Sequence, residues 1–384
     1  MTKNNRPLEG LVVLEFAQFL AGPWCGLRLA DLGAQVIKIE RPGTGDIGRT
    51  LYLNQPSSTG VNLLFQAINR NKQSFAANLK DEADRECLFK LIGKADVLIQ
   101  NFRPGVMDRL GFGYDAVKEI NKGLVYASIS GFGEGGPWVK LPGQDLLAQA
   151  RSGITWLNGF RDDPPMPVGV ALADILAGHN LLEGILASLV GRARTGVGAR
   201  VDTSLLEGLI DFQFELLTAY LNENEIPPVR PQKTGAHAFL TAPYGIYETS
   251  DSYLAIAMTP LAKLADLLTM PELNGFEAED GGFSERDTIY ALLAQKLAGQ
   301  STAHWLGILQ PADIWCAEVM NWPELFASEG MKRLNMVQQL TGPTGPLLRT
   351  TRPAMRINGE GLTSETPAPE VGQHTAEIAR AFGL

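Results

Sequence analysis

Residues 10–40, GLVVLEFAQFLAGPWCGLRLADLGAQVIKIE, decide the fold of this chain. The apolar run Gly10–Phe16 is short and rich in residues that favour strands, so it predicts a buried strand. A small-residue turn follows at Ala21–Gly26, then a helix at Leu27–Leu32 and a second strand at Gln35–Ile39. A strand, a helix and a strand in such close succession form a βαβ unit, which joins parallel strands. We therefore expect a parallel sheet that binds its ligand at the carboxyl ends of its strands.

The alternation of strands and helices continues beyond this unit. Further strands are predicted at Ser74–Asn78, Ala95–Ile99 and Leu124–Ser130, with an amphipathic helix at Asp81–Ile92. The loop Gln100–Gly105 leaves one of these strands, at the edge of the sheet where a ligand is expected. The pattern predicts the α/β fold class.

A long apolar helix is predicted in PVGVALADILAGHNLLEGILASLVGRARTG, residues 167–196. Asp174 stands in its first turn. There its carboxylate can accept hydrogen bonds from free backbone N–H groups, and the helix dipole is expected to keep it ionised at neutral pH. Two interpretations stay open. Asp174 is an N-cap residue, or it is a nucleophilic carboxylate for which small neighbours such as Ala173 and Gly178 leave room.

The pattern changes after a second long helix, predicted at Thr203–Leu221. Tyr244–Met258 predicts a hairpin, and helices follow at Leu261–Leu268 and Asp287–Leu297. The last part is expected to be mostly extended up to a closing helix at Thr375–Phe382. The predicted domains are the first part of a large domain at 1–224, a small α+β domain at 225–310, and a segment at 311–384 that returns to the large domain.

Composition and charge narrow the possible functions. The 384 residues carry 42 acidic and 33 basic side chains, a net charge of -9, so neither nucleic acid nor a membrane surface is an expected partner. No apolar stretch approaches the roughly 18 residues of a membrane span, and the first residues lack the core of a signal peptide, so we expect a cytoplasmic protein. The scattered cysteines and histidines predict neither a disulfide nor a metal site. They are Cys25, Cys87, Cys316, His179, His237, His304 and His374.

Eight segments, in order, resemble the family III CoA-transferases, which include formyl-CoA transferase and carnitine CoA-transferase and extend to the α-methylacyl-CoA racemases. The segments are residues 7–46, 69–80 (NRNKQSFAANLK), 95–115, 124–137 (LVYASISGFGEGGP), 143–154 (GQDLLAQARSGI), 168–189, 194–208 and 367–375 (PAPEVGQHT). The resemblance implies a Rossmann-like large domain made from both chain ends, a small inserted domain and an interlocked homodimer. It also implies transfer of CoA from an acyl-CoA to a free carboxylic acid, with no permanently bound cofactor.

Carried over residue by residue, the resemblance puts the family's catalytic aspartate at Asp174. Its carboxylate would first form an acyl anhydride and then a CoA thioester, and both intermediates stay activated. The positions whose family counterparts contact CoA are Leu20, Ala21, Arg41, Ala77, Lys80, Asn101, Phe102 and Arg109. Cations at three of these positions suit the phosphates of CoA, although Arg41 by itself could equally be a surface residue.

Gln144, in Gly143-Gln144-Asp145, departs from part of the family. Racemases carry histidine there, because moving a proton off and onto an α-carbon needs groups that exchange protons, and an amide does not. An α-methylacyl-CoA racemase and a non-catalytic acyl-CoA binder remain alternative hypotheses. We expect Gln144 either to stabilise an oxyanion or to be a satisfied loop residue. Formyl-CoA transferase has Gln at the position of Leu20 and Tyr at that of Gln144, so its specificity does not follow.

Overall fold

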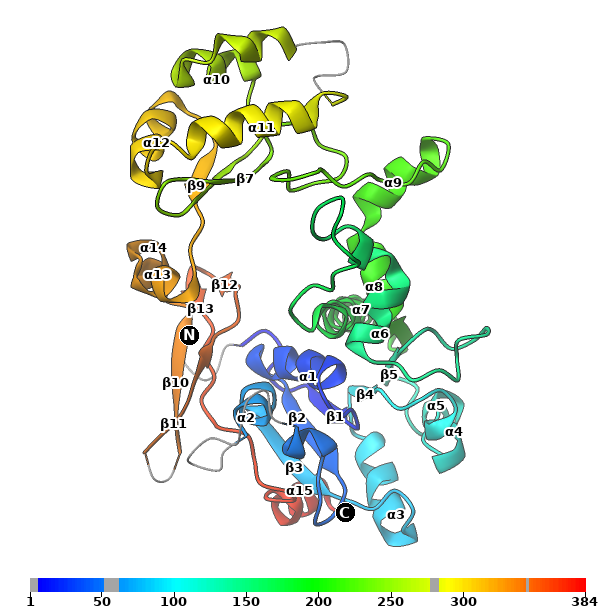
Figure 1. The fold of residues 1–384 in the computed structure, drawn as a ribbon. Coiled ribbons are helices and arrows are strands. Elements are labelled where there is room, and N and C mark those ends of the chain that lie inside the picture. Colours follow the sequence, from blue (N-terminus) through cyan, green and yellow to red (C-terminus); the bar gives the residue numbers. More distant parts are fainter. Residues whose placement is uncertain (1–5, 52–61, 277–282, 343–344) are drawn as a thin grey trace. The chain divides into compact units, whose positions relative to one another are not determined.

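The computed structural model describes residues 6–51, 62–276, 283–342 and 345–384 (Figure 1). The chain forms two compact units, each of which is described here by itself. The first unit contains Met1–Ser152, Val170–Phe212 and Leu334–Leu384, and the second contains Gly153–Gly169 and Gln213–Arg333.

A six-stranded parallel sheet forms the centre of the first unit, which confirms the predicted α/β class. The strands are β1 Val12–Glu15, β2 Gln35–Glu40, β3 Lys72–Ala76, β4 Val97–Gln100, β5 Val125–Ser130 and β6 Arg200–Ser204. Their order is β3-β2-β1-β4-β5-β6. The chain adds β2 and β3 on one side of β1 and then β4, β5 and β6 on the other, so the strand order reverses between β1 and β4. In a doubly wound sheet the ligand crevice opens at such a switch point.

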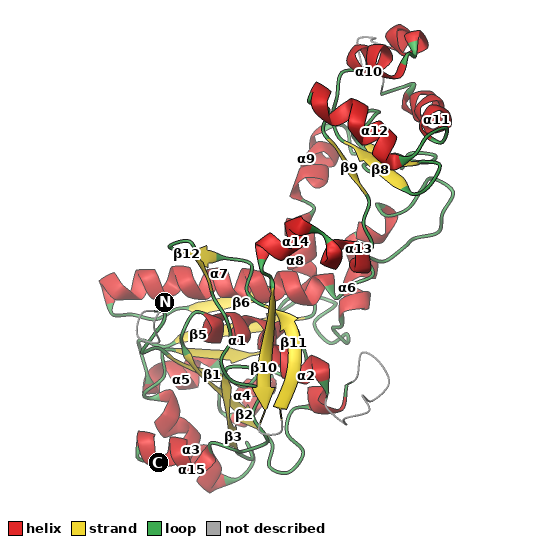
Figure 2. Ribbon diagram, turned by 90° about the vertical axis from the view of Figure 1, so that its left-hand side faces the viewer, coloured by secondary structure: helices red, strands yellow, loops and turns green. Residues whose placement is uncertain are grey.

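Helices cover both faces of this sheet (Figure 2). One face is covered by α1 Ala21–Asp31 and α7 Leu172–Thr195, and the other by α3 Glu82–Ile92, α4 Val106–Leu110, α5 Tyr114–Ile120 and α15 Thr375–Phe382. On the second face, Leu14 and Ile37 of the strands pack in one core cluster with Leu88 and Ile378 of the helices. The remaining helices of the unit are α2 Leu63–Asn69, α6 Asp145–Ser152 and α8 Leu205–Phe212.

The 24-residue helix α7 follows the predicted apolar pattern. Ala173, Ala177, Leu181 and Ile185 are fully buried, at the four-residue spacing of one helix face. The helix ends at Gly196, whose φ of 71° places it in the left-handed region that favours glycine. By length and composition alone α7 could cross a membrane, but 39% of its most apolar window is buried inside the protein, where it packs on α1, α8 and the sheet.

The first helix begins earlier than predicted. The segment Ala21–Gly26, expected to be a turn, forms the first half of α1. Pro23 is tolerated there because the first N–H groups of a helix have no partner inside the helix. Gly22 and Gly26 are needed for contact, since a Cβ at Gly22 would lie 2.3 Å from the Ala17 Cβ and one at Gly26 would meet the Glu15 carboxylate. The small residues therefore allow α1 to lie against β1.

The predicted helix Thr203–Leu221 was wrong in two respects. Its first residues belong to β6, a strand that was not predicted, and α8 ends at Phe212 before a separate helix α9 begins. The side chain of Ser204 caps α8, accepting from Glu207 N at 3.0 Å and donating to its carboxylate at 2.6 Å. Strand β6 alternates exposed and partly buried residues, and pairing with β5 stabilises it.

The second unit has an antiparallel sheet in the order β7-β8-β9. The predicted hairpin is present, and Leu264 and Leu293 of the two predicted helices pack with Tyr247 and Leu254 in a core beside it. The elements are α9 Phe214–Asn222, β7 Gly245–Glu248, β8 Tyr253–Ile256, α10 Leu261–Leu268, α11 Arg286–Leu297, α12 Thr302–Leu309, β9 Cys316–Glu318, α13 Trp322–Ala327 and α14 Glu329–Leu334. Because β9 pairs with β8, this unit extends past the boundary expected at 310.

The C-terminal part is less extended than expected. Besides α13 and α14 it contains two hairpins, with strands β10 Val337–Gly342, β11 Gly345–Thr351, β12 Arg356–Ile357 and β13 Glu360–Gly361. The closing helix α15 has the predicted bounds. Just before it, His374 N donates to Ser74 O at 3.0 Å, and Ala76 N donates to Thr375 Oγ1 at 2.9 Å. These bonds satisfy the free edge of β3.

Candidate active site

The residues predicted to contact CoA lie mostly where the parallel strands end. Leu20 and Ala21 follow β1, Arg41 follows β2, Ala77 and Lys80 follow β3, and Asn101 and Phe102 follow β4. Because β1 to β4 are parallel neighbours, these exits share one edge of the sheet. Arg109 lies separately, in the last turn of α4.

Asn101 joins the two loops that flank the switch point. Its side-chain Oδ1 accepts from Gln18 N at 2.8 Å, and its Nδ2 donates to Gln18 O at 2.7 Å. The exit loop of β4 thus holds the backbone just before Leu20 through both of its polar groups. Asn101 therefore positions the turn at the start of α1, a role that its sequence position did not reveal.

A close crossing brings α1 to the helix that carries Asp174. A Cβ added at Gly178 would lie 2.7 Å from the Ala21 carbonyl oxygen and 2.9 Å from the Trp24 ring, so glycine is required there. Asp174 and Gly178 are four residues apart in α7 and share one face of that helix. The helix face that carries Asp174 thus crosses the predicted CoA turn one helical turn further on, at Gly178.

Asp174 is not the N-cap of α7, which was one of the two interpretations. The cap position is Ala171, whose methyl group cannot accept a hydrogen bond, and Asp174 is the third helical residue. The free N–H groups of Ala173 and Asp174 instead donate to Asp145 Oδ1, at 2.7 and 3.2 Å. Among the described residues, the Asp174 carboxylate has no hydrogen-bond partner.

The expectation that Asp174 stays ionised at neutral pH was wrong. Burial raises its pKa, and the nearby Asp145 carboxylate raises it further, to about 7. The helix dipole does not offset these effects, because the N–H groups that carry its positive end already bind Asp145. Asp174 is therefore a carboxyl group that changes charge near neutral pH, which is typical of functional sites.

Gln144 directly precedes Asp145, the residue that caps α7. Its side chain is exposed and has no hydrogen-bond partner among the described residues, so it is not a satisfied loop residue in this structure. Its backbone is fixed by a close contact between two glycines: a Cβ at Gly143 would lie 2.5 Å from the Gly131 Cα. Gly131 directly follows β5, so the loop of residues 132–142 returns to its starting point before α6 begins.

A buried group of charged side chains binds the backbone just before Leu20. The sequence reasoning missed this group. Lys38 Nζ lies 3.0 Å from Glu15 Oε1 and 2.7 Å from Asp46 Oδ2, and it donates to Ala17 O at 2.9 Å. Asp46 in turn accepts from Phe19 N at 3.3 Å. The sequence did contain a sign of this group: the charged residues Glu15 and Lys38 stand inside the apolar strand sequences VVLEF and VIKIE.

The same group anchors the start of α1. Lys72 Nζ lies 2.8 Å from Glu15 Oε2 and donates to Pro23 O and Asn69 Oδ1, each at 2.9 Å. The four charged side chains of the group, Glu15, Lys38, Asp46 and Lys72, are each at most 3% exposed. Buried charges persist only when they are paired and hydrogen-bonded.

Three cations are available at the sheet edge and beyond it. Arg41, Lys80 and Arg109 are exposed, and none has an ion-pair partner among the residues that the structure describes. Unpaired Lys and Arg side chains are the groups that bind phosphates. Among all the residues that the structure describes, no group of three His, Cys, Asp or Glu side chains could hold a metal ion.

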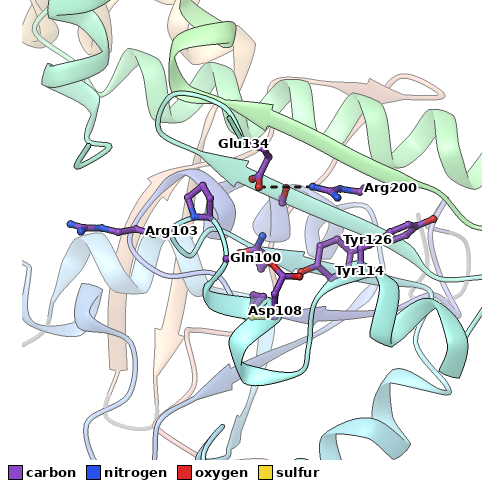
Figure 3. Close-up of a pocket in the computed structure, with 11 residues that line it drawn as sticks. Gln100, Arg103, Asp108, Tyr114, Tyr126, Glu134 and Arg200 are labelled. Carbon is purple, nitrogen blue, oxygen red and sulfur yellow. Dashed lines mark ion pairs between the residues drawn. The ribbon is translucent and has the colours of Figure 1, made fainter. Parts of the chain in front are cut away.

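A surface pocket is lined in part by the loop after β4, and Asp174 is not among its lining residues (Figure 3). It is lined by Gln100, Arg103, Asp108, Tyr114, Tyr126, Ser128, Glu134 and Arg200, among others, and by none of the predicted site residues. Of its charged residues, Arg200 lies 3.9 Å from Glu134, and it also lies 2.7 Å from Asp202, which is outside the lining. We therefore place the candidate active site at Asp174 rather than in this pocket.

The fold and the site together define a class of protein: a doubly wound α/β enzyme with a half-buried, unpartnered carboxylate on a helix that packs against α1. The chain belongs to CoA-transferase family III, whose model matches residues 8–375. This confirms the resemblance that the eight segments indicated.

Known relatives agree with the family. The chain is 36% identical to the acetyl-CoA:oxalate CoA-transferase of Acetobacter aceti, over 96% of this chain and 98% of that protein. It is 30% identical to the succinyl-CoA:glutarate CoA-transferase of Mus musculus, over 98% and 86%. The crystal structure of a CAIB/BAIF family protein from Brucella suis superposes with a TM-score of 0.83 at 32% identity, over 99% and 100%. The protein is a CoA-transferase, which moves CoA between acyl-CoA thioesters and carboxylic acids.

Proposed function

We propose that Asp174 is the nucleophile of this CoA-transferase and carries the acyl group and CoA in turn. The observation that carries the proposal is a half-buried carboxylate with no hydrogen-bond partner among the described residues, on the face of α7 that crosses α1 at Ala21. A carboxylate with a structural role would normally be hydrogen-bonded or paired as it leaves water.

The reaction needs two pairs of steps. A carboxylate oxygen of Asp174 attacks the acyl carbon of the donor thioester, the C–S bond breaks, and CoA leaves as a thiolate. The thiolate then attacks the aspartyl carbonyl of the resulting anhydride, and the donor acid leaves as a carboxylate. The acceptor carboxylate attacks the aspartyl thioester, which releases the thiolate and forms a second anhydride. The thiolate then attacks the acceptor's acyl carbon in this anhydride and forms the new acyl-CoA. Asp174 is thereby regenerated with its charge.

A carboxylate suits this exchange for an energetic reason. Both the anhydride and the aspartyl thioester are activated acyl groups, so the free energy of the donor thioester is kept through every step. A serine nucleophile would form an ordinary ester, from which a carboxylate acceptor could not recover the thioester. Covalent catalysis is productive only when its intermediate remains reactive towards the next nucleophile.

Gln144 is the proposed donor to the oxyanion that forms in these attacks. The first N–H groups of α7 are already bound: Ala173 and Asp174 donate to Asp145, and Leu172 N donates to Val170 O at 2.8 Å. Gln144 directly precedes Asp145, and its amide has no other partner among the described residues. A single preorganised donor of this kind typically contributes about 10²–10³ in kcat.

The CoA moiety is proposed to lie along the strand exits from Leu20 to Phe102, with its phosphates near Arg41, Lys80 and Arg109. The unpaired charge of these three cations and the parallel edge that bears the first two support this placement. For the acids, we propose that at least one is a dicarboxylic acid. The names of two relatives pair CoA with oxalate and with glutarate, both of which carry a second carboxylate.

We further propose that the enzyme is an interlocked homodimer. Helix α9 supports this, because it is apolar yet contains no buried residue, and Phe214 and Leu221 are 70% and 65% exposed. Val190 on α7 is 65% exposed as well. Apolar helix faces of this kind mark surfaces that another chain covers.

The test measures CoA exchange by wild type, Asp174→Ala and Asp174→Asn, with acetyl-CoA and succinyl-CoA as donors and oxalate and glutarate as acceptors. We expect both variants to lose at least about 10³-fold in kcat, as enzymes do when their nucleophile is removed. Mass spectrometry of wild type with acyl-CoA alone should find CoA or acyl on the peptide that contains Asp174.

Three other outcomes would count against this proposal. Exchange that survives in Asp174→Ala would exclude this nucleophile. Binding of acyl-CoA without exchange by wild type would favour the non-catalytic binder. Deuterium uptake at the α-carbon of a 2-methylacyl-CoA would favour the racemase, and we expect none, because Gln144 cannot exchange a proton near pH 7.

A further inference from the structure

The N-terminus of α7 is capped by a residue from another element. Its own cap position is Ala171, which offers no side-chain acceptor. Asp145, the first residue of α6, supplies the oxygen instead and binds the N–H groups of Ala173 and Asp174 at 2.7 and 3.2 Å. One of the two bonds is therefore made to the backbone of the proposed nucleophile itself.

Asp145 is held rigidly in this position. Its second oxygen, Oδ2, accepts from Gln149 Nε2 at 2.7 Å. Gln149 is 1% exposed, and its Nε2 also lies 3.3 Å from Val170 O, in the segment that leads into α7. Both carboxylate oxygens of Asp145 are thus engaged, one by α7 and one by its own helix. A carboxylate fixed in this way keeps a constant distance from the Asp174 side chain.

A fixed negative charge beside Asp174 affects the reaction in one direction. The form of Asp174 that attacks is the charged carboxylate, and the residue is neutral in both covalent intermediates, the anhydride and the aspartyl thioester. Repulsion from Asp145 raises the free energy of the charged form and leaves the neutral forms nearly unaffected. The neighbour therefore makes Asp174 more basic, hence a better nucleophile, and favours its acylated states.

We propose that Asp145 is a positioning residue for CoA transfer: it fixes the backbone of Asp174 by capping α7, and its charge favours the acylated forms of Asp174. This inference rests on the proposed role of Asp174 as the nucleophile. It assigns two separable effects to one side chain, the hydrogen bonds of the cap and the charge. Substitutions can remove the charge alone or both together.

Asp145→Asn removes the charge and keeps an oxygen that can accept from Ala173 and Asp174. The amide of Gln149 can turn to present its oxygen to the new side chain. Asp145→Ala removes charge and cap. Glu183→Gln is the matched control, because it removes one negative charge from an exposed position of α7, more than two turns from Asp174.

The first measurement is the titration of the Asp174 carboxyl group without substrate, by infrared difference spectroscopy against Asp174→Asn. In wild type and in Glu183→Gln we expect a pKa of about 7. In Asp145→Asn the pKa should fall by about one unit or more, as it does when a like charge is removed. An unchanged pKa in Asp145→Asn would overturn the charge effect.

The second measurement is the fraction of enzyme that carries a covalent adduct after mixing with acyl-CoA, together with kcat and KM. Asp145→Asn should lower the ratio of acylated to free enzyme by about tenfold, the equivalent of one pKa unit, and should slow acylation rather than release of the new acyl-CoA. Asp145→Ala should lose more, and its melting temperature should fall, since it also loses the cap of α7. Full activity in Asp145→Ala would overturn the capping role.

These outcomes separate the inference from the proposed function. If wild type forms no adduct on Asp174, the nucleophile assignment fails whatever Asp145 does. The carboxyl titration does not depend on any adduct, so a lowered pKa in Asp145→Asn would still support the coupling of the two carboxylates. If wild type forms the adduct and Asp145→Asn matches it in adduct fraction, kcat and pKa, only the inference about Asp145 fails.

Discussion

Asp174 is placed where its ionised form is unfavourable, and this has a consequence for stability. Its pKa in the folded protein is about 7, above the value of 3.8 for a free carboxyl group. Between roughly pH 4 and pH 7 the folded state therefore binds more protons than the unfolded state, and stability falls as the pH rises through this range. The ionised Asp174 side chain therefore lowers the stability of the fold, and a neutral side chain there should remove this cost.

Asp174→Asn should accordingly stabilise the protein, and more so at pH 8 than at pH 5. Each unit of pKa difference corresponds to about 1.4 kcal/mol, so a gain of about 1–3 kcal/mol at pH 8 is reasonable for a partly relaxed site. Urea unfolding at both pH values measures the gain. A gain that is equal at both pH values, or larger at pH 5, would show that ionisation of Asp174 is not its source.

The sequence singles out this residue but not its state of ionisation. The place of Asp174 at the start of an apolar helix left a cap and a nucleophile open, and only the family resemblance assigned it the catalytic role. Its ionisation depends on Asp145, which lies 29 positions earlier and reaches it only through the packing of α6 on α7. The alanine at position 171 was the one local sign, since a helix without a capping side chain requires an acceptor from elsewhere.

At the scale of elements, the buried charges beneath α1 are the least replaceable feature. Lys38 separates two carboxylates, Glu15 and Asp46, in a place where none of the three is more than 2% exposed. Their net effect on stability is set by how completely each charge is paired. The same side chains bind the backbone of the turn at Leu20, so the network couples stability to the proposed CoA site.

Lys38→Met should therefore destabilise the fold by about 3–5 kcal/mol, because it leaves two buried carboxylates without their shared cation. It should also raise the KM for acyl-CoA. Lys332→Met serves as the control: its pair with Glu329 is exposed, and losing it costs about 0–1 kcal/mol. Urea unfolding compares the two variants. Similar free energies of unfolding for both would mean that the buried network does not stabilise the protein.

Most elements were predictable because their patterns are local. The helix α10 and the closing helix α15 have the predicted bounds, and β2 differs by one residue. Strand β6 was missed because it lies at the sheet edge, with a pattern of exposed and partly buried residues that becomes a strand only by pairing with β5. Tertiary pairing overrode the local signal there.

At the scale of the whole molecule, the exposed apolar surface is the main unexplained feature of a single chain. Trp322 is 80% exposed and Phe214 70%. The division into units was also hard to predict, because residues 153–169 and 311–333 join the second unit through contacts distant in sequence. Segments that leave one compact unit and return to it give no local signal in the sequence.

Light scattering should find a homodimer, with about twice the chain mass of 41.6 kDa. Phe214→Glu should lower the yield of dimer on refolding, because it puts a charge on an apolar surface that the partner is proposed to cover, and interlocked subunits form and separate only as the chains fold and unfold. Glu223→Lys, at an exposed position just after α9, is the control and should leave the dimer intact. A monomeric wild type would refute the proposed assembly.

The contact between Gly131 and Gly143 has a consequence for how this enzyme could diversify. Because the two backbones touch, the eleven intervening residues form a closed loop whose two ends are in contact. Its contents can be lengthened, shortened or exchanged while the chain re-enters α6 at the same point. Grafting the corresponding piece from a relative should thus leave the start of α6 in place, and with it the bonds from Ala173 and Asp174 to Asp145, so this loop can vary without disturbing the proposed nucleophile.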